Sequence, residues 1–418
     1  MSVAPWTRIV LQALACLLFS CAAASQTSPQ SLRHDAIALE QQGNNVQAAQ
    51  AWQAIVKLHP SDAEAYAHLG LIAAREQRYD NAVALYRKAL ALNAKFPGLR
   101  LNLGLAYFKG GRLKDAIQQF RLLLSAPSVS PADSLRLNEL TGMAHYGLGE
   151  YAQAVPYLQA AAAADKRNLP LRLALAHSCL WSKNNPCVMD TYKEILEIDP
   201  ESAEAYVLAG EAMDAMKNST GAIEQFRHAI QVDPKLPHVH FGLGYLLWTQ
   251  KDYPGATSEF RAELALDPDY MQALLYLADC AIKTDQLDVA RPLLERVVVM
   301  APAEPLGHLD LGIIYSESGR KDEALHQLTI AEKLMPGDEV TTDQSTVHWR
   351  LGQLYKSMGK MEEAKAELAK AAAVNRAADE AVYKKMSSGN ARPPASAPAG
   401  TELSPATGQQ PPVAPPNP

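Results

Sequence analysis

The sequence has few aromatic residues, few cysteines and almost no segments that resemble β-strands. Aromatic residues make up 7% of the chain and hydrophobic residues 48%, so most of its apolar side chains are small or aliphatic. Runs of β-branched residues are nearly absent, and the nearest one, residues 296–300, lies within a helical pattern. These absences argue against a β or α/β fold and favour an all-helical chain.

The sequence also lacks a basic stripe. Its formal net charge is −6 at pH 7, whereas proteins that bind nucleic acids concentrate Lys and Arg on one surface. We therefore expect no nucleic-acid partner. The 418 residues exceed the usual size of a single hydrophobic core, but an array of stacked units escapes that limit. One elongated domain is more consistent with the sequence than several globular ones.

What the sequence does contain is a skeleton that recurs about every 34 residues from residue 29 to residue 376. Each unit has a small residue in its first half and another twelve places later, as with Gly210 and Ala222. Nineteen of these twenty positions hold Gly or Ala, and Val188 is the exception. The ten units begin near Pro29, Ala63, Pro97, Leu135, Leu169, Ala203, Pro237, Met271, Pro305 and Ser345.

Small residues at this spacing predict pairs of antiparallel helices in close contact. Two helix backbones approach closely only where no branched side chain separates them, and larger residues then pack around that point. Bulky residues such as Phe226 and Phe260 follow each second small residue by four places. Each hairpin exposes an apolar face that only the next hairpin covers.

This pattern resembles the tetratricopeptide repeat (TPR) family, whose 34-residue helix-turn-helix unit carries these small, bulky and proline sites. The resemblance covers residues 29–376. It implies an all-α, right-handed superhelical solenoid of about ten repeats, with a concave groove that binds peptides or partner helices. It implies no cofactor.

The C-terminal part of the chain changes in composition. Residues 377–388 read as an amphipathic helix that caps the last repeat. Residues 389–418 are rich in Pro and Ala, and we expect them to be a disordered, extended tail that acts as a spacer or contacts a partner.

Residues 1–24 are typical of an export signal, with one basic residue, a short apolar run and small residues at the end. Two processing routes fit. Cleavage after Ala24 releases a soluble protein, whereas the residues from Leu18 to Cys21 resemble a bacterial lipoprotein signal that is acylated on Cys21. We therefore expect an exported protein, in the bacterial periplasm or attached to the outer membrane, and any membrane contact would be through this lipid anchor.

Motifs for catalysis or metal binding are missing from the sequence. The histidines do not occur in pairs four residues apart, and no metalloprotease, nucleophile-elbow or phosphate-binding motif is present. We expect no enzymatic activity, no metal site and no cofactor.

Two cysteines of the fifth unit lie on either side of a helical turn. Cys179 ends the first predicted helix and Cys187 opens the second. They fit a disulfide in an oxidising compartment, or two small side chains that are partly buried.

The first predicted helix of each repeat carries a second row of side chains, which takes no part in the predicted packing between helices. This row is largely apolar and aromatic in repeats three to eight. It predicts a partner-binding groove unless neighbouring helices or the tail cover it. The groove candidates are Leu101, Leu105, Phe108, Met143, Tyr146, Leu180, Trp181, Phe241, Tyr245 and Trp248.

These observations predict a non-catalytic scaffold of the bacterial cell envelope that binds a peptide or helix of a partner protein. Two alternatives remain open: an accessory subunit of a secretion, pilus or polysaccharide-export machine, and a chaperone-like holder of exported chains. The sequence leaves the partner and the oligomeric state undetermined.

Overall fold

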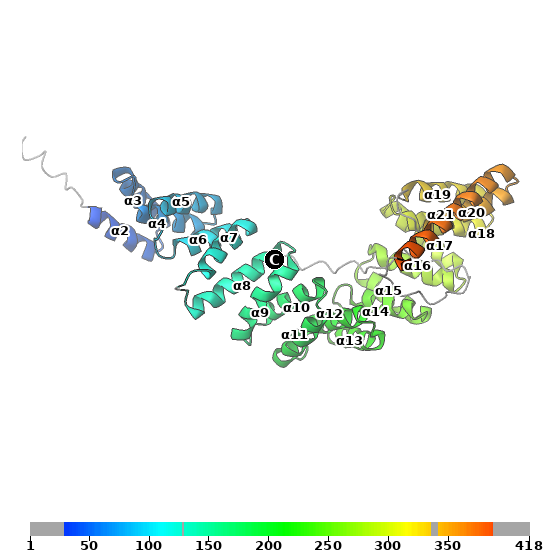
Figure 1. Ribbon diagram of the computed structural model, residues 1–418, viewed down its shortest axis with the longest axis horizontal. Helices are drawn as coiled ribbons and strands as arrows, with labels where there is room; N and C mark the ends of the chain where they lie inside the picture. Colours follow the sequence, from blue (N-terminus) through cyan, green and yellow to red (C-terminus); the bar gives the residue numbers. More distant parts are fainter. Residues whose placement is uncertain (1–28, 128, 336–341, 388–418) are drawn as a thin grey trace, which may run out of the picture. The chain divides into compact units, whose positions relative to one another are not determined.

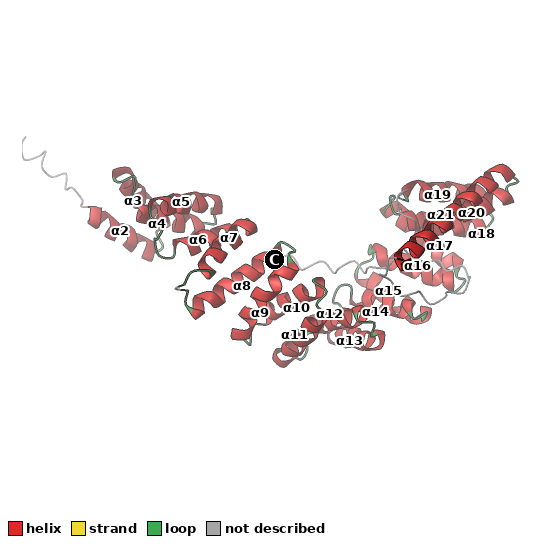
Figure 2. Cartoon of the chain, in the orientation of Figure 1, coloured by secondary structure: helices red, strands yellow, loops and turns green. Residues whose placement is uncertain are grey.

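The computed structural model describes residues 29–127, 129–335 and 342–387. These residues form helices joined by short turns and contain no β-strand (Figure 2). The prediction of an all-α fold is therefore confirmed. The predicted export signal with Cys21 and the predicted tail at residues 389–418 lie outside the described residues.

The chain divides into two compact units, residues 1–183 and 184–418, which we call unit 1 and unit 2. The helices of unit 1 are α2 (Pro29–Gln41), α3 (Asn45–Leu58), α4 (Ala63–Arg75), α5 (Tyr79–Leu92), α6 (Leu99–Lys109), α7 (Leu113–Leu124), α8 (Pro131–Gly147), α9 (Tyr151–Ala164) and α10 (Leu169–Trp181). The helices of unit 2 are α11 (Asn185–Ile198), α12 (Ala203–Ala215), α13 (Ser219–Val232), α14 (Val239–Thr249), α15 (Tyr253–Leu266), α16 (Met271–Lys283), α17 (Leu287–Met300), α18 (Pro305–Glu317), α19 (Lys321–Leu334), α20 (Thr342–Ser357) and α21 (Met361–Ser387).

Within each unit, every helix packs against the helices that precede and follow it in the sequence (Figure 1). Helix α4 contacts its hairpin partner α5, and α5 contacts α6 of the next repeat. The first helices of consecutive repeats are also in contact: α14 contacts α16, and α18 contacts α20. This arrangement of neighbours is that of a helical repeat array. We call the side of a unit formed by its first helices the inner face.

The small residues predicted at the helix contacts lie in the core. All twenty are buried. A Cβ atom added to Gly210 would come within 2.9 Å of the Phe226 ring, and one added to Gly242 in the next repeat would come within 2.6 Å of the same ring. The Phe226 ring therefore fills space within its own repeat and between two repeats. This packing is possible because both facing positions are glycine.

Val188 stands where the other repeats have Ala. Val188 itself is buried, but Tyr192, at the bulky site four residues later, is only partly buried. The Tyr192 hydroxyl donates a hydrogen bond to Gln225 Oε1 of the next repeat at 2.8 Å. In this repeat, a polar contact with the next repeat thus accompanies a bulky side chain that is only partly buried.

Each hairpin turn contains a residue in the left-handed backbone region. These residues are Gly43, Gln77, Gly111, Gly149, Lys183, Lys217, Lys251, Asp285, Gly319 and Gly359, with φ between 58° and 79°. The left-handed residue ends the first helix and lets the second helix reverse direction. The sequence shows this position as glycine in only half of the repeats.

The prediction that residues 377–388 form a separate capping helix is wrong. Helix α21 runs without a break through Met361–Ser387. This segment contains neither Gly nor Pro and is rich in strong helix formers, so the second helix of the tenth repeat simply continues beyond the repeat boundary.

Candidate functional site

The groove candidates on α6 lie on the surface of the unit 1 core. Leu101, Leu105 and Phe108 are partly buried and pack against the hydrophobic cluster of the second and third repeats. They therefore contribute to the packing of the repeats and also present part of their apolar surface to solvent.

The candidates on α8 and α10 come together as an aromatic group. Met143, Tyr146, Leu180 and Trp181 are all partly buried. The rings of Tyr146 and Trp181 are stacked with centroids 6.3 Å apart, and Tyr151 of α9 lies 4.5 Å from Trp181. Unit 1 thus places seven of the ten candidates on its inner face.

The remaining three candidates lie on α14 in unit 2, and one of them is corrected by the structure. Tyr245 and Trp248 are partly exposed, but Phe241 is 3% exposed and contacts Phe260 in the core. The expectation that Phe241 is accessible to a partner is wrong. Its ring packs instead against Tyr276, which lies 5.5 Å from Tyr245 and 5.1 Å from Trp248.

A buried carboxylate holds the start of α14. Glu263 of α15 is 1% exposed and accepts hydrogen bonds from the backbone N–H groups of His238, at 2.9 Å, and Phe241, at 3.1 Å. His238 has a left-handed backbone and makes no side-chain cap, so Glu263 supplies the acceptor that the helix end needs. This contact fixes the helix that carries Tyr245 and Trp248.

Sequence reasoning missed several residues of the inner face of unit 2. Trp349 of α20 is 39% exposed, and it follows the start of its repeat by the same four places as Phe241. Tyr276 is shifted by one residue from the predicted stripe. Trp349 was identifiable by extending the stripe to the tenth repeat, whereas Tyr276 needed the helix contacts to be known.

Carboxylates on this face have raised pKa values. Burial, and next the charge of Asp214, raise the pKa of Glu211 to about 7. Burial, followed by the charges of Asp279 and Asp343, raises the pKa of Asp310 to about 8. The effect of Asp279 and Asp343 on Asp310 shows that acidic side chains of three successive first helices lie near one another.

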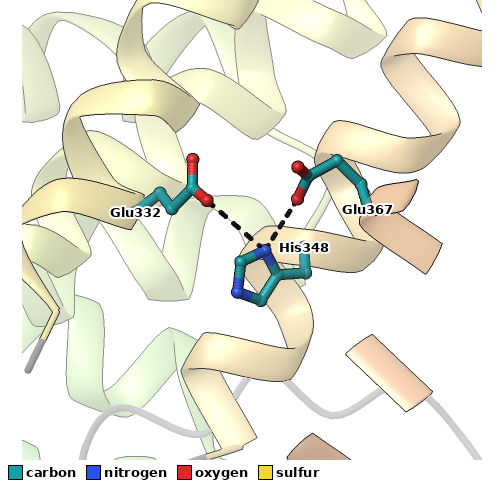
Figure 3. Close-up of side chains that lie close together, drawn as sticks. All are labelled: Glu332, His348 and Glu367. Carbon is teal, nitrogen blue, oxygen red and sulfur yellow. Dashed lines mark hydrogen bonds and ion pairs between the residues drawn. The ribbon is translucent and has the colours of Figure 1, made fainter. Parts of the chain in front are cut away.

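Three side chains of the last helices could in principle hold a cation. Glu332 of α19, His348 of α20 and Glu367 of α21 bring one nitrogen and two oxygens within 4.8 Å of one another (Figure 3). Lys370 Nζ already donates to Glu332 at 3.1 Å and to Glu367 at 2.8 Å. The hydrogen bond to Glu367 is the main cause of a raised pKa of Lys370. An ammonium group thus already pairs with both carboxylates, and the cluster ties three helices together.

The cysteines differ in their state. Cys179 and Cys187 are each disulfide-bonded, and Cys280 is the free, buried cysteine of the described residues. Burial is the main cause that raises the pKa of the Cys280 thiol to about 12, which makes it unreactive. That Cys179 and Cys187 are bonded to each other remains a prediction.

Comparison with known families identifies the repeat. Three models described as tetratricopeptide repeat match the sequence: one at residues 36–98, 211–270 and 241–305, one at 73–136 and one at 345–377. Together they cover more than half of the chain, which therefore belongs to the tetratricopeptide repeat family. Proteins of this family bind protein or peptide partners and are generally not catalysts.

Several solved structures are similar to parts of the chain, and no curated protein sequence matches it. YrrB, a TPR protein with an unusual peptide-binding site, is 20% identical, with 47% of this chain and 97% of YrrB covered and a TM-score of 0.40. Yeast Tom70 is 17% identical over 87% of this chain and 92% of Tom70, with a TM-score of 0.40. PilW, a type IV pilus biogenesis factor, is 19% identical over 48% of this chain and 91% of PilW, also at 0.40.

The helices of the described residues were also compared with the requirements of a membrane span. None of them combines the length and the apolar character that crossing a bilayer requires.

Proposed function

We propose that this protein is a non-catalytic scaffold of the bacterial cell envelope that binds a peptide or helix of a partner protein on its inner faces. The observation that carries the proposal is the grouping of partly exposed aromatic residues on first helices. Tyr146 and Trp181 form one group, and Tyr245, Trp248 and Tyr276 form another. Aromatic side chains supply much of the affinity of protein interfaces.

The envelope location is supported by the sequence of residues 1–24, which is typical of an export signal. Membership of the TPR family supports protein or peptide partners. Attachment through Cys21 would hold the scaffold at a membrane surface, and cleavage after Ala24 would leave it free in the periplasm.

Site-specific photo-crosslinking in the native host tests the proposal. A photoreactive phenylalanine replaces Trp248 on the inner face of unit 2, or Val299 on the second helix α17, where the side chain is 79% exposed. We expect Trp248 to crosslink a defined partner and Val299 to give none, because only the first position lies on the binding face. Equal crosslinking from both positions would contradict a role for the inner face.

The same experiment separates the alternatives. One stable partner supports the scaffold, several components of one machine support an accessory subunit, and many unrelated exported chains support a holder function. A photoreactive phenylalanine in place of Tyr146 applies the same test to the aromatic group of unit 1.

A further inference from the structure

The inner face of unit 2 differs in charge from that of unit 1. The first helices of unit 2 carry seven carboxylates and three basic side chains. Those of unit 1 carry five carboxylates and six basic side chains. The acidic character is therefore a property of one inner face and does not follow from the net charge of the whole chain.

Four of these carboxylates lack the partners that a structural role would require. Glu211, Asp214, Asp310 and Asp343 are partly buried, and the described part of the chain offers them no hydrogen bond or ion pair. Partly buried carboxylates without partners cost free energy, because they lose hydration without gaining a hydrogen bond or an ion pair. Such groups point to a cation that is supplied from outside.

The basic side chains of this face do not compensate for them. Arg350 interacts with Glu317, with its Nη1 atom 3.4 Å from a carboxylate oxygen, and lies 5.2 Å from the centre of the Trp349 ring. Lys283 is engaged in a contact of its own, although its charge and that of Arg350 still lower the pKa of Asp310. The net effect of the surroundings on that pKa is nevertheless a rise.

The same face carries aromatic rings, two of them close to acidic side chains. Burial, and next the charge of Asp214, raises the pKa of Tyr245. Trp248 donates a hydrogen bond to Asp279 at 2.6 Å. Trp349 is exposed on α20. Faces of Trp and Tyr rings attract Lys and Arg side chains, and carboxylates form charge-assisted hydrogen bonds with them. Both features favour the same kind of ligand.

We propose that the inner face of unit 2 binds a protein segment rich in Lys or Arg. This inference rests on the proposed function and specifies the chemistry of the partner. The cationic side chains pair with Glu211, Asp310 and Asp343 and stack on Trp248 and Trp349, while the aliphatic part of the segment contacts Tyr245.

Charge complementarity disfavours the other occupants. Residues 390–418 of this chain contain one Arg and one Glu and therefore bring no net positive charge. A second copy of the protein carries a net charge of −6 and would bring further acidic surface to this face. A basic partner is the occupant that stabilises the ionised form of these carboxyl groups.

Fluorescence anisotropy with the full chain tests the inference. The probe is a labelled amphipathic peptide of Leu, Ala and Lys, and its twins carry Gln or Glu in place of every Lys. We expect the Lys peptide to bind about tenfold more tightly than the Gln twin, with the Glu twin weakest and with added salt weakening the Lys peptide most.

Two triple variants provide the matched comparison. Glu211→Gln, Asp310→Asn and Asp343→Asn should weaken binding of the Lys peptide about tenfold and flatten its dependence on salt. The control carries Glu197→Gln, Glu224→Gln and Asp288→Asn, which remove the same charge from exposed positions on second helices of unit 2 and should leave binding unchanged.

Equal affinity for the Lys and Gln peptides, no detectable binding, or equal loss in both triple variants would overturn the inference. If Tyr245→Ala and Trp248→Ala weaken both peptides equally, the aromatic binding face remains and only the basic partner is rejected. If the Lys peptide binds as expected but Trp248 yields no crosslink in the host, the face recognises basic segments and the proposed scaffold function fails.

Discussion

The indole nitrogen of Trp248 donates a hydrogen bond to Asp279 at 2.6 Å and so joins the first helices of the seventh and eighth repeats. Asp279 is only 7% exposed. The bond orients an aromatic side chain of the proposed binding face and at the same time gives a buried carboxylate its partner. A residue that we expect to bind a partner protein thus also supports the stacking of two repeats.

Replacing Trp248 by Phe should destabilise the protein by about 1–3 kcal/mol, because it leaves the buried Asp279 without its donor. Urea denaturation followed by circular dichroism measures the change. The second variant, Trp248→Phe with Asp279→Leu, removes both polar partners and should recover part of the loss. If the single variant is as stable as the parent, the hydrogen bond does not contribute to repeat stacking.

The contact of Gly244 with Phe260 leads to a second prediction. A Cβ atom at Gly244 would lie 2.7 Å from the Phe260 ring, so Gly244→Ala should destabilise the protein by about 1–2 kcal/mol even though Ala favours helix. Adding Phe260→Leu should relieve the clash, since Ala278 and Leu294 occupy the same two positions one repeat later. Additive losses measured in a double-mutant cycle would contradict the clash.

The repeat architecture could be predicted from sequence because every hairpin needs the same close contact. A position such as Gly244 tolerates only small residues, so the 34-residue spacing of Gly and Ala reports the packing directly. Individual side chains of the inner face are less constrained. Phe241 follows the pattern of the exposed stripe but is buried, because Tyr276 and Phe260 of neighbouring helices cover its ring.

The acidic group was not predicted for a related reason. Asp279, Asp310 and Asp343 lie far apart in the sequence and at different places within their repeats. Their proximity depends on how consecutive first helices contact one another, which the periodicity of a single repeat does not give.

The hairpin turns give a third prediction. Lys251 has a φ of 64° in a position that Gly319 occupies two repeats later with a φ of 74°. Because a side chain is strained in this backbone region, Lys251→Gly should stabilise the protein by about 0.5–1 kcal/mol. Thermal unfolding checks the sign, with Arg227→Gly in the middle of α13 as a control that should destabilise by about 1 kcal/mol. A loss of stability from Lys251→Gly would refute the strain.

The carboxylates of unit 2 should make stability depend on pH. Asp310 has an ordinary pKa of 3.8 and a pKa of about 8 in the folded chain. The folded state therefore binds more protons than the unfolded state between about pH 4 and pH 8, and the free energy of unfolding should fall as the pH rises through that range.

The variant Asp310→Asn isolates this contribution. It should match the parent near pH 4 and be more stable than the parent at pH 8–9, because the uncharged amide needs no counter-charge. Melting temperatures at a series of pH values give the comparison, and Asp288→Asn on the exposed side of α17 serves as a control with the parent's profile. Parallel profiles for Asp310→Asn and the parent would show that Asp310 titrates normally.

The cysteines of the fifth repeat provide the last prediction. Trypsin cuts after Arg172, Lys183 and Lys193, which leaves Cys179 and Cys187 on separate peptides. If the two are bonded to each other, non-reducing mass spectrometry should find these peptides joined and reductant should separate them. Cys280 should be alkylated only after unfolding, because it is buried and its thiol pKa is about 12.

A bond between Cys179 and Cys187 would close a short loop and should stabilise the protein by about 2–3 kcal/mol. Reductant should therefore lower the melting temperature of the parent but not that of a variant with Ser at both positions. Two free thiols at these positions in the native protein would show that the bond does not form.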